Sequence, residues 1–160
     1  MSAIVLLDTS VYLNVLDVPG RNQDRKAILD VFEHRVVDGD HFLLPMAAIR
    51  ETGNHISRLD SGETRYRLGR RLVADVGKAI AGEAPYRPTH FPEREEFLTW
   101  LQAFPDWAKR DKSHTRTDEG PSLVDLSIFK EWERTRSQYS MSRVLIWSLD
   151  SDLAAYDTGH

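Results

Sequence analysis

The 160-residue chain contains no cysteine, which excludes disulfides, thiol nucleophiles and cysteine-ligated metal clusters and favours a reducing cytosol. Its hydrophobic content of 41% and charged content of 29% are typical of a globular protein, and its length suits one domain better than two. A formal net charge of −4 argues against a general polyanion-binding surface, so contact with a nucleic acid would need local basic patches.

The first part of the chain alternates strand and helix patterns. The continuous apolar run at residues 4–7 predicts a strand buried on both faces. The longest apolar run near the amino terminus, Ala3 to Leu7, is too short for a signal-peptide core or a membrane span. Helical spacing predicts helices over residues 9–16 and 23–37, separated by the Pro19-Gly20 turn. A second strand at residues 42–44 should end at Pro45, and a helix over residues 46–59 should follow it.

The rest of the chain repeats this alternation. A helix is expected over residues 61–81, with one apolar face made by Leu68, Leu72, Val76 and Ile80. The proline-rich segment 82–92 should end it, and a helix over residues 93–104 would place Phe97, Leu98, Leu101 and Phe104 on one side. A helix over residues 122–135, a buried strand over residues 143–148 and a short helix after Asp150 complete the series. Alternating strands and helices predict an α/β fold with an open parallel sheet covered on both faces.

Four acidic residues lie at or near expected strand ends. Asp8 and Asp150 directly follow strands, Glu51 lies in the helix after the second strand, and Asp125 lies in the helix that begins at residue 122. The carboxyl ends of parallel strands share one edge of the sheet. Carboxylates crowded there would repel one another unless a hard cation neutralised them, and Mg²⁺ or Mn²⁺ prefers oxygen ligands. The pattern predicts a metal site that activates water against a phosphodiester bond.

Each acid also has a purely structural interpretation. Asp8 and Asp150 could be helix N-caps, and Ser122 with Asp125 has the spacing of a capping box. Glu51 could be an ordinary solvated residue of a helix surface.

The segment Ile-Val-Leu-Leu-Asp-Thr-Ser-Val at residues 4–11 resembles the opening signature of PIN-domain nucleases, including VapC-like toxins. The second, third and fourth acids of that family resemble Glu51, Asp125 and Asp150, in the same order along the chain. The resemblance covers nearly the whole chain and implies a single PIN-like domain over residues 1–160, built as a three-layer α/β/α sandwich around a parallel sheet. It also implies cleavage of RNA with Mg²⁺ or Mn²⁺, and frequent dimerisation. Ser148 stands where the family more often has threonine, and residues 82–120 are longer than in compact members, as an arm for substrate or partner would be.

Further residues would support this site. Asp152 could be a fifth ligand, and the hydroxyl of Thr9, Ser10 or Ser148 could orient a carboxylate, although helix capping explains Thr9 and Ser10 equally well. Asn54 and His55 follow Glu51 by one helical turn and could reach the metal edge, although a lone histidine is more often a surface or packing residue.

Two groups of side chains outside the acid set could contact partners. Arg67, Arg70 and Arg71 lie in the basic helix over residues 61–81 and could bind successive phosphates, with a solvated helix exterior as the equal alternative. A second basic stretch comprises Lys109, Arg110, Lys112 and Arg116, which a polar loop would also explain. Trp100, Phe104 and Trp107 have the spacing of a buried stripe, which favours a core or a dimer face over base stacking.

The leading hypothesis is a cytoplasmic, metal-dependent endoribonuclease that acts on RNA as a homodimer without membrane attachment. In its finer form, the protein is the toxin of a toxin–antitoxin pair, with a cognate antitoxin protein as partner. The alternative is a catalytically weak or inactive PIN-fold module that binds RNA or protein. A third class, phosphoryl transfer through an aspartyl phosphate on Asp8, is disfavoured because Ser10 stands where haloacid-dehalogenase-like phosphatases have a second aspartate.

Overall fold

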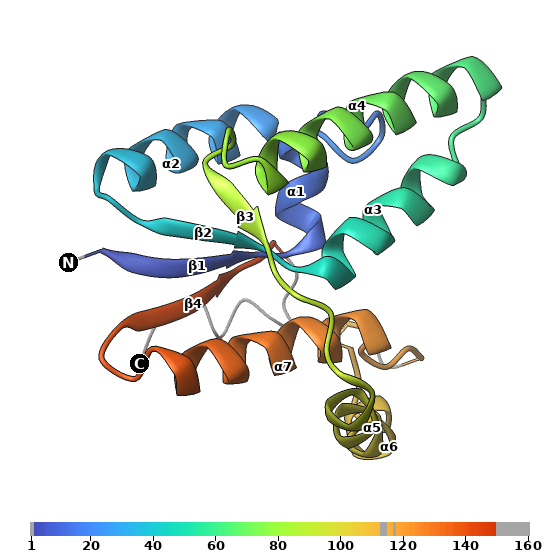
Figure 1. Ribbon diagram of the computed structural model, residues 1–160. Helices are drawn as coiled ribbons and strands as arrows, with labels where there is room; N and C mark the ends of the chain where they lie inside the picture. Colours follow the sequence, from blue (N-terminus) through green and yellow to red (C-terminus); the bar gives the residue numbers. More distant parts are fainter. Residues whose placement is uncertain (1, 113–114, 117, 150–160) are drawn as a thin grey trace.

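The computed structural model describes residues 2–112, 115–116 and 118–149. The strands of this part of the chain form one parallel sheet in the order β3-β2-β1-β4 (Figure 1). They are β1 (Ala3–Leu7), β2 (His41–Leu44), β3 (Tyr86–Pro88) and β4 (Arg143–Trp147). The predicted α/β fold with a parallel sheet is confirmed.

Helices cover both faces of the sheet. One layer contains α1 (Thr9–Val15), α2 (Arg25–Val37) and α4 (Gly62–Ile80), and the other contains α7 (Leu123–Gln138) (Figure 1). The short helices α5 (Arg94–Gln102) and α6 (Phe104–Ala108) pack against α7 and lie away from the sheet. The result is the three-layer α/β/α sandwich that the resemblance implied, and no described helix has the length and apolar character needed to cross a membrane.

The apolar sequence of β1 matches its central position. Val5, Leu6 and Leu7 have no exposed surface because neighbouring strands flank them and helices cover both faces. Leu7 pairs with Trp147, so β1 and β4 end at the same level of the sheet. The residues that follow these strands, Asp8 and Ser148, are therefore brought together.

Helix α3 (Met46–Ser57) begins directly after β2 and links the two helical layers. It packs against α1 and α4 on one side and against α7 on the other (Figure 1). The backbone N–H of Met46 donates a hydrogen bond of 3.0 Å to Thr89 Oγ1, which ties the start of the helix to the chain after β3. The start of this helix consequently lies at the edge where the strands end.

The sequence reading missed β3 and α6. The sequence predicts a proline-rich, helix-ending segment at residues 82–92, whereas Tyr86–Pro88 form a strand that pairs with β2. β3 lies at an edge of the sheet, where a proline removes no necessary ladder hydrogen bond. In α6, Pro105 occupies the first turn, where its missing N–H also costs nothing. The helix expected after Asp150 lies outside the described residues.

The predicted apolar face of α4 is wrong at its end. Leu68 is fully buried, but Ile80 is 73% exposed and Ala79 takes its place in the core. A repeat of four residues advances about 40° beyond a full turn at 3.6 residues per turn, so the stripe drifts off the buried face by its fourth member. The face that packs includes Asp75, whose Oδ2 accepts hydrogen bonds of 2.6 Å from the hydroxyls of Tyr12 and Tyr86.

The predicted apolar side of the helix after residue 93 is also wrong. Phe97, Leu98 and Leu101 are between 37% and 56% exposed, and Trp100 is the buried residue of α5. Because α5 packs against α6 and α7 instead of against the sheet, it buries a narrower stripe than a core helix would. Trp100 and Trp107 are both buried, as their packing interpretation predicted, and Phe104 packs partly buried against the core.

Candidate functional site

Asp8 lies at the junction of β1 and β4. Its backbone N–H donates to the Trp147 carbonyl at 3.0 Å, and its side chain is 3% exposed. Its Oδ2 accepts hydrogen bonds from Ser148 Oγ at 2.6 Å and from Ser10 Oγ at 2.9 Å. The Ser10 hydroxyl also accepts the backbone N–H of Leu149 at 3.0 Å. Ser10 and Ser148 therefore both contact the Asp8 carboxylate directly, which supports their predicted role in orienting it.

The N-cap interpretation is wrong for the side chain of Asp8. The residue occupies the N-cap position of α1 with extended backbone angles, but its carboxylate makes no capping hydrogen bond. The two serine hydroxyls hold the carboxylate toward the strand ends instead of toward the amides of α1.

The capping-box interpretation of Asp125 is confirmed. Ser122 Oγ accepts the Asp125 backbone N–H at 3.1 Å, and Asp125 Oδ2 accepts the Ser122 backbone N–H at 3.2 Å. Asp125 is also 7% exposed and lines a cavity. Capping and cavity lining therefore coexist in this residue, because the start of α7 lies at that cavity.

Glu51 is held on α3 by its own helical neighbours. Its side chain is 25% exposed, Asn54 Nδ2 donates to its Oε2 at 3.2 Å, and His55 Nε2 lies 3.5 Å from its Oε1. Glu51 and His55 face the same cavity as Asp8. This position differs from that of the solvated surface glutamate considered as the alternative.

Three of the predicted carboxylates share one hollow. A cavity of about 390 Å³ at the carboxyl ends of the strands is lined by Asp8, Glu51 and Asp125, together with Thr9, Ser10 and His55. These acids come from β1–α1, α3 and α7, which are far apart in the sequence. Asp150 and Asp152 lie outside the described residues.

The donor chemistry of the hollow suits a hard divalent cation, since it consists mainly of carboxylate and hydroxyl oxygens. Thr9 lines the same hollow, and its Oγ1 is buried without a hydrogen-bond partner among the described residues. Within those residues, no three histidine, aspartate or glutamate side chains already form a group that could hold a metal ion. The metal site therefore stays a prediction, in which Asp150 supplies the further ligand.

His55 has a lowered pKa. Burial is the largest cause, and the positive charge of Arg21 adds to it, whereas the neighbouring Glu51 acts in the opposite direction. The imidazole is consequently neutral near pH 7, and it can accept a proton or a hydrogen bond at the cavity wall.

Basic side chains also line this hollow. Lys112 and Arg116, both in the basic stretch recognised in the sequence, lie there with Arg21 and Glu119. Lys112 Nζ forms an ion pair of 3.3 Å with Glu119 Oε1. Arg21 was missed, because a single arginine after a Pro-Gly turn carries no signal of the cavity that it faces. These cations provide positive charge beside the acids despite the net negative charge of the chain.

The arginines predicted on the basic helix lie elsewhere. Arg67, Arg70 and Arg71 belong to α4 and do not line the cavity of Asp8. Arg71 Nη1 donates to the carbonyls of Leu16 and Asp17 at 3.0 and 3.2 Å, which fastens α4 to the end of α1. A contact of these arginines with RNA stays a prediction, and for Arg71 the structure supplies a packing role.

Comparison with known proteins supports the fold. No family model and no curated protein matches the sequence. A solved structure, FitAcB from Neisseria gonorrhoeae, is similar with 23% identity and a TM-score of 0.50, over 94% of this chain and 92% of that chain. At this identity the similarity shows a shared α/β/α sandwich fold alone, and the interpretation of the site rests on the geometry described above.

Proposed function

We propose that this protein is a Mg²⁺- or Mn²⁺-dependent endoribonuclease that hydrolyses phosphodiester bonds of RNA. The observation that supports it most is that Asp8, Glu51 and Asp125, from three separate segments, line a single hollow at the carboxyl edge of the sheet. Ordinary caps and surface acids have no reason to converge in this way, whereas ligands of one cation must.

Some residues of the hollow would bind the metal ion, and others would orient the side chains that bind it. Asp8, Glu51 and Asp125, with Asp150, would hold the cation. When bound, such a cation lowers the pKa of water and neutralises charge that develops on the phosphoryl oxygens. Ser10 and Ser148 fix the orientation of the Asp8 carboxylate through their two hydrogen bonds, and the Asn54 amide does the same for Glu51.

The basic side chains of the hollow would position the RNA backbone. Arg21, Lys112 and Arg116 line the same cavity and can bind the phosphate next to the acids. Neutral His55 is available there as a proton acceptor for the attacking water.

Asp8→Asn is the direct test of this function. The amide keeps the size of the side chain and can still accept from both serines, but it removes a charged ligand. We expect cleavage of single-stranded RNA with Mn²⁺ to fall at least a hundredfold, in line with the loss of an essential charged group, while thermal unfolding shows a folded protein. Asp106→Asn is the matched control, because the Asp106 side chain is 87% exposed on α6, and it should cleave like the parent protein. Undiminished cleavage in EDTA, or by the Asp8→Asn protein, would rule the proposal out.

A non-catalytic RNA- or protein-binding module is the second candidate. The observation in its favour is that the described residues do not by themselves form a ready three-ligand group for a metal ion. RNA binding without Mn²⁺-dependent cleavage by the parent protein would favour this candidate.

We further propose a homodimer that acts as the toxin of a toxin–antitoxin pair, with an antitoxin protein as its partner. The support is the resemblance of residues 4–11 and of the ordered acids to VapC-like toxins. A neighbouring reading frame that encodes a small DNA-binding protein would support the pairing, and its absence would favour an RNA-processing role.

A further inference from the structure

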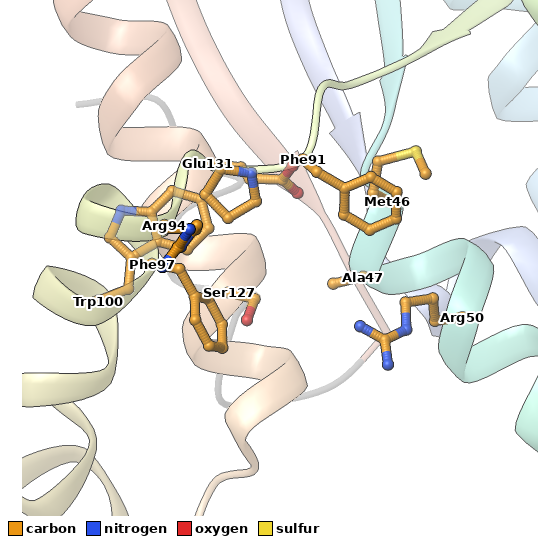
Figure 2. A pocket seen from close by; sticks show the side chains of 10 residues that line it. Met46, Ala47, Arg50, Phe91, Arg94, Phe97, Trp100, Ser127 and Glu131 are labelled. Atoms are coloured by element: carbon orange, nitrogen blue, oxygen red, sulfur yellow. The ribbon is translucent and has the colours of Figure 1, made fainter.

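A second hollow of about 280 Å³ lies between the start of α3, the segment after β3, α5 and α7 (Figure 2). Its walls are largely apolar and aromatic, with Met46, Ala47, Phe91, Phe97 and Trp100. Arg50, Arg94, Ser127 and Glu131 add polar groups to this wall. The volume lies just below the roughly 300–1,000 Å³ of pockets for drug-sized molecules, so it suits a single ring system.

The aromatic side chains of this hollow are accessible to a ligand. Phe91 is 58% exposed and Phe97 is 41% exposed, while Trp100 is buried behind them. The exposure of apolar phenylalanine surface to water is unfavourable. A flat ring stacked on these side chains would cover that surface and so bind favourably.

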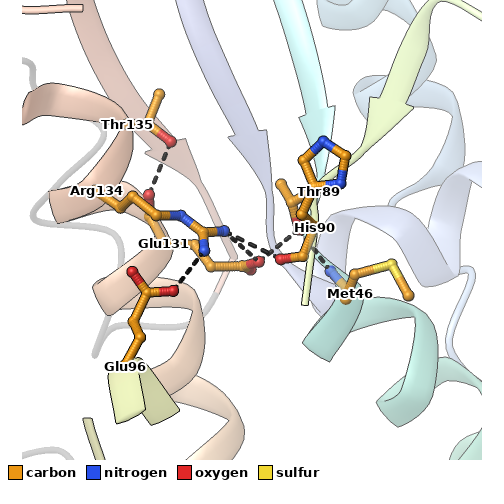
Figure 3. A network of polar contacts seen from close by, with 7 residues as sticks. All are labelled: Met46, Thr89, His90, Glu96, Glu131, Arg134 and Thr135. Atoms are coloured by element: carbon orange, nitrogen blue, oxygen red, sulfur yellow. Dashed lines mark hydrogen bonds and ion pairs between the residues drawn. The ribbon is translucent and has the colours of Figure 1, made fainter. Parts of the chain in front are cut away.

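Glu131 is a buried acid at this hollow. The residue is only 2% exposed. Its Oε1 accepts one hydrogen bond from Thr89 Oγ1 and another, of 3.4 Å, from Arg134 Nη2 (Figure 3). Oε2 is buried and has no hydrogen-bond partner among the described residues. A buried polar atom without a partner is unfavourable, so a ligand that brings an N–H donor to Oε2 would be bound selectively.

Two arginines provide positive charge beside the aromatic wall. Arg50 and Arg94 are exposed, and neither has a hydrogen bond or an ion pair within the described part of the chain. The hollow also adjoins the candidate cleavage site: Ala47 here and Glu51 there lie one turn apart on the same face of α3, as do Ser127 here and Val124 there on α7. A ligand that extends from one hollow to the other would pass these arginines.

We propose that this second hollow binds one base of the RNA substrate, stacked on Phe91 and Phe97, with an N–H of the base donating to Glu131 Oε2 and a neighbouring phosphate bound by Arg50 and Arg94. The proposal rests on the proposed ribonuclease function for its choice of substrate, and it adds a base-recognition pocket to the cleavage site. An apolar side chain of a protein partner would fill the ring-sized space, but it would supply neither the donor for Oε2 nor the anion for the arginines.

The stacking is tested by binding of fluorescent hexaribonucleotides in EDTA and, separately, in Ca²⁺. Phe97→Ala should weaken binding at least about tenfold, which lies in the lower part of the range for base–aromatic stacking. Leu98→Ala is the matched control, since Leu98 is 56% exposed on the same helix and does not line the hollow. It should bind like the parent protein.

The polar contacts are tested by two further variants. At pH 8, above the pKa of about 7 that burial gives this carboxyl, Glu131→Gln replaces an ionised acceptor with an amide. The affinity ratio of oligo(C) to oligo(U) should then fall about fivefold, because cytosine presents an amino group and uracil a carbonyl. Affinity for RNA falls as salt rises, and Arg94→Ala should make this dependence less steep. The slope of log affinity against log salt should become less negative by about 0.7, the value for one phosphate contact on a single strand. Lys26→Ala, on exposed α2 surface outside both hollows, removes the same charge and should leave the slope unchanged.

The base pocket is overturned if Phe97→Ala binds like Leu98→Ala and Glu131→Gln keeps the parent ranking of bases, a result that would favour a protein occupant. Absence of RNA binding in both buffers overturns it as well. Cleavage of RNA together with binding that does not depend on Phe97 would leave the nuclease proposal intact. Phe97-dependent binding without any cleavage would support the pocket and remove the nuclease.

Discussion

At the scale of single residues, the chemistry of Asp8 depends on where two strands end. Its neighbours Ser10 and Ser148 could be named from the sequence because both follow buried-strand patterns, and both donate to its Oδ2. The role of Glu131 could not be predicted, since a glutamate inside a helical segment normally faces solvent. Only the packing of α7 against the segment after β3 shows that it is buried beside Thr89.

Glu131 should make the stability of the protein depend on pH. Burial raises the pKa of its carboxyl from an ordinary value of 4.5 to about 7, with Thr89 and Arg134 acting in the opposite direction. Between these two pH values the folded protein keeps a proton that the unfolded chain has lost. Unfolding therefore releases a proton, and raising the pH lowers the free energy of unfolding.

The variant Glu131→Gln isolates this effect. A shift of one pKa unit corresponds to about 1.4 kcal/mol, so the parent protein should lose up to about 3 kcal/mol relative to the variant between pH 4.5 and pH 8. Urea unfolding at a series of pH values measures the difference. Glu133→Gln serves as the control, because Glu133 is an exposed residue of the same helix paired with Lys130. A constant difference between parent and Glu131→Gln across this range would contradict the raised pKa.

At the scale of elements, the first turn of α7 contains a capping box and also lines the cavity. The capping box of Ser122 and Asp125 satisfies backbone amides of its first turn and keeps the Asp125 side chain at the hollow. Ser122→Ala removes one of these two hydrogen bonds, and we expect the free energy of unfolding to fall by about 1 kcal/mol in urea titrations. Ser137→Ala near the exposed end of α7 should change it little. Equal stability of the Ser122→Ala and parent proteins would mean that the cap contributes nothing.

The elements that the sequence predicted well are those with a strong repeating pattern. β1 and β4 are continuous, largely buried apolar runs, and α7 begins at a recognisable cap. β3 is three residues long and includes Pro88, so its pairing with β2 depends on the tertiary structure and leaves no local pattern. The error at Ile80 has a different origin, since a repeat of four departs from the true helical period.

At the scale of the whole molecule, the sheet topology brings the candidate ligands together. The order of the acids along the chain predicted a shared edge, because parallel strands end on the same side. The lining of one hollow by Asp8, Glu51 and Asp125 required the packing of α3 between α1 and α7, which no local pattern encodes. Arg21 also lines this hollow, and it could not be predicted either, because its position depends on the tertiary packing.

A cation bound between these segments should stabilise the entire fold. Acids of β1–α1, α3 and α7 would share one divalent cation, so binding favours the folded chain over the unfolded one by about 2.7 kcal/mol when free Mn²⁺ is a hundredfold above its dissociation constant. For a chain of this size that corresponds to a rise in Tm of roughly 5–10 °C. Thermal unfolding in EDTA and in Mn²⁺ measures the rise, which Asp106→Asn should retain and Asp8→Asn should lose. A Tm that does not respond to Mn²⁺ in the parent protein would argue against the cation site, and because no RNA is present, the result separates metal binding from catalysis.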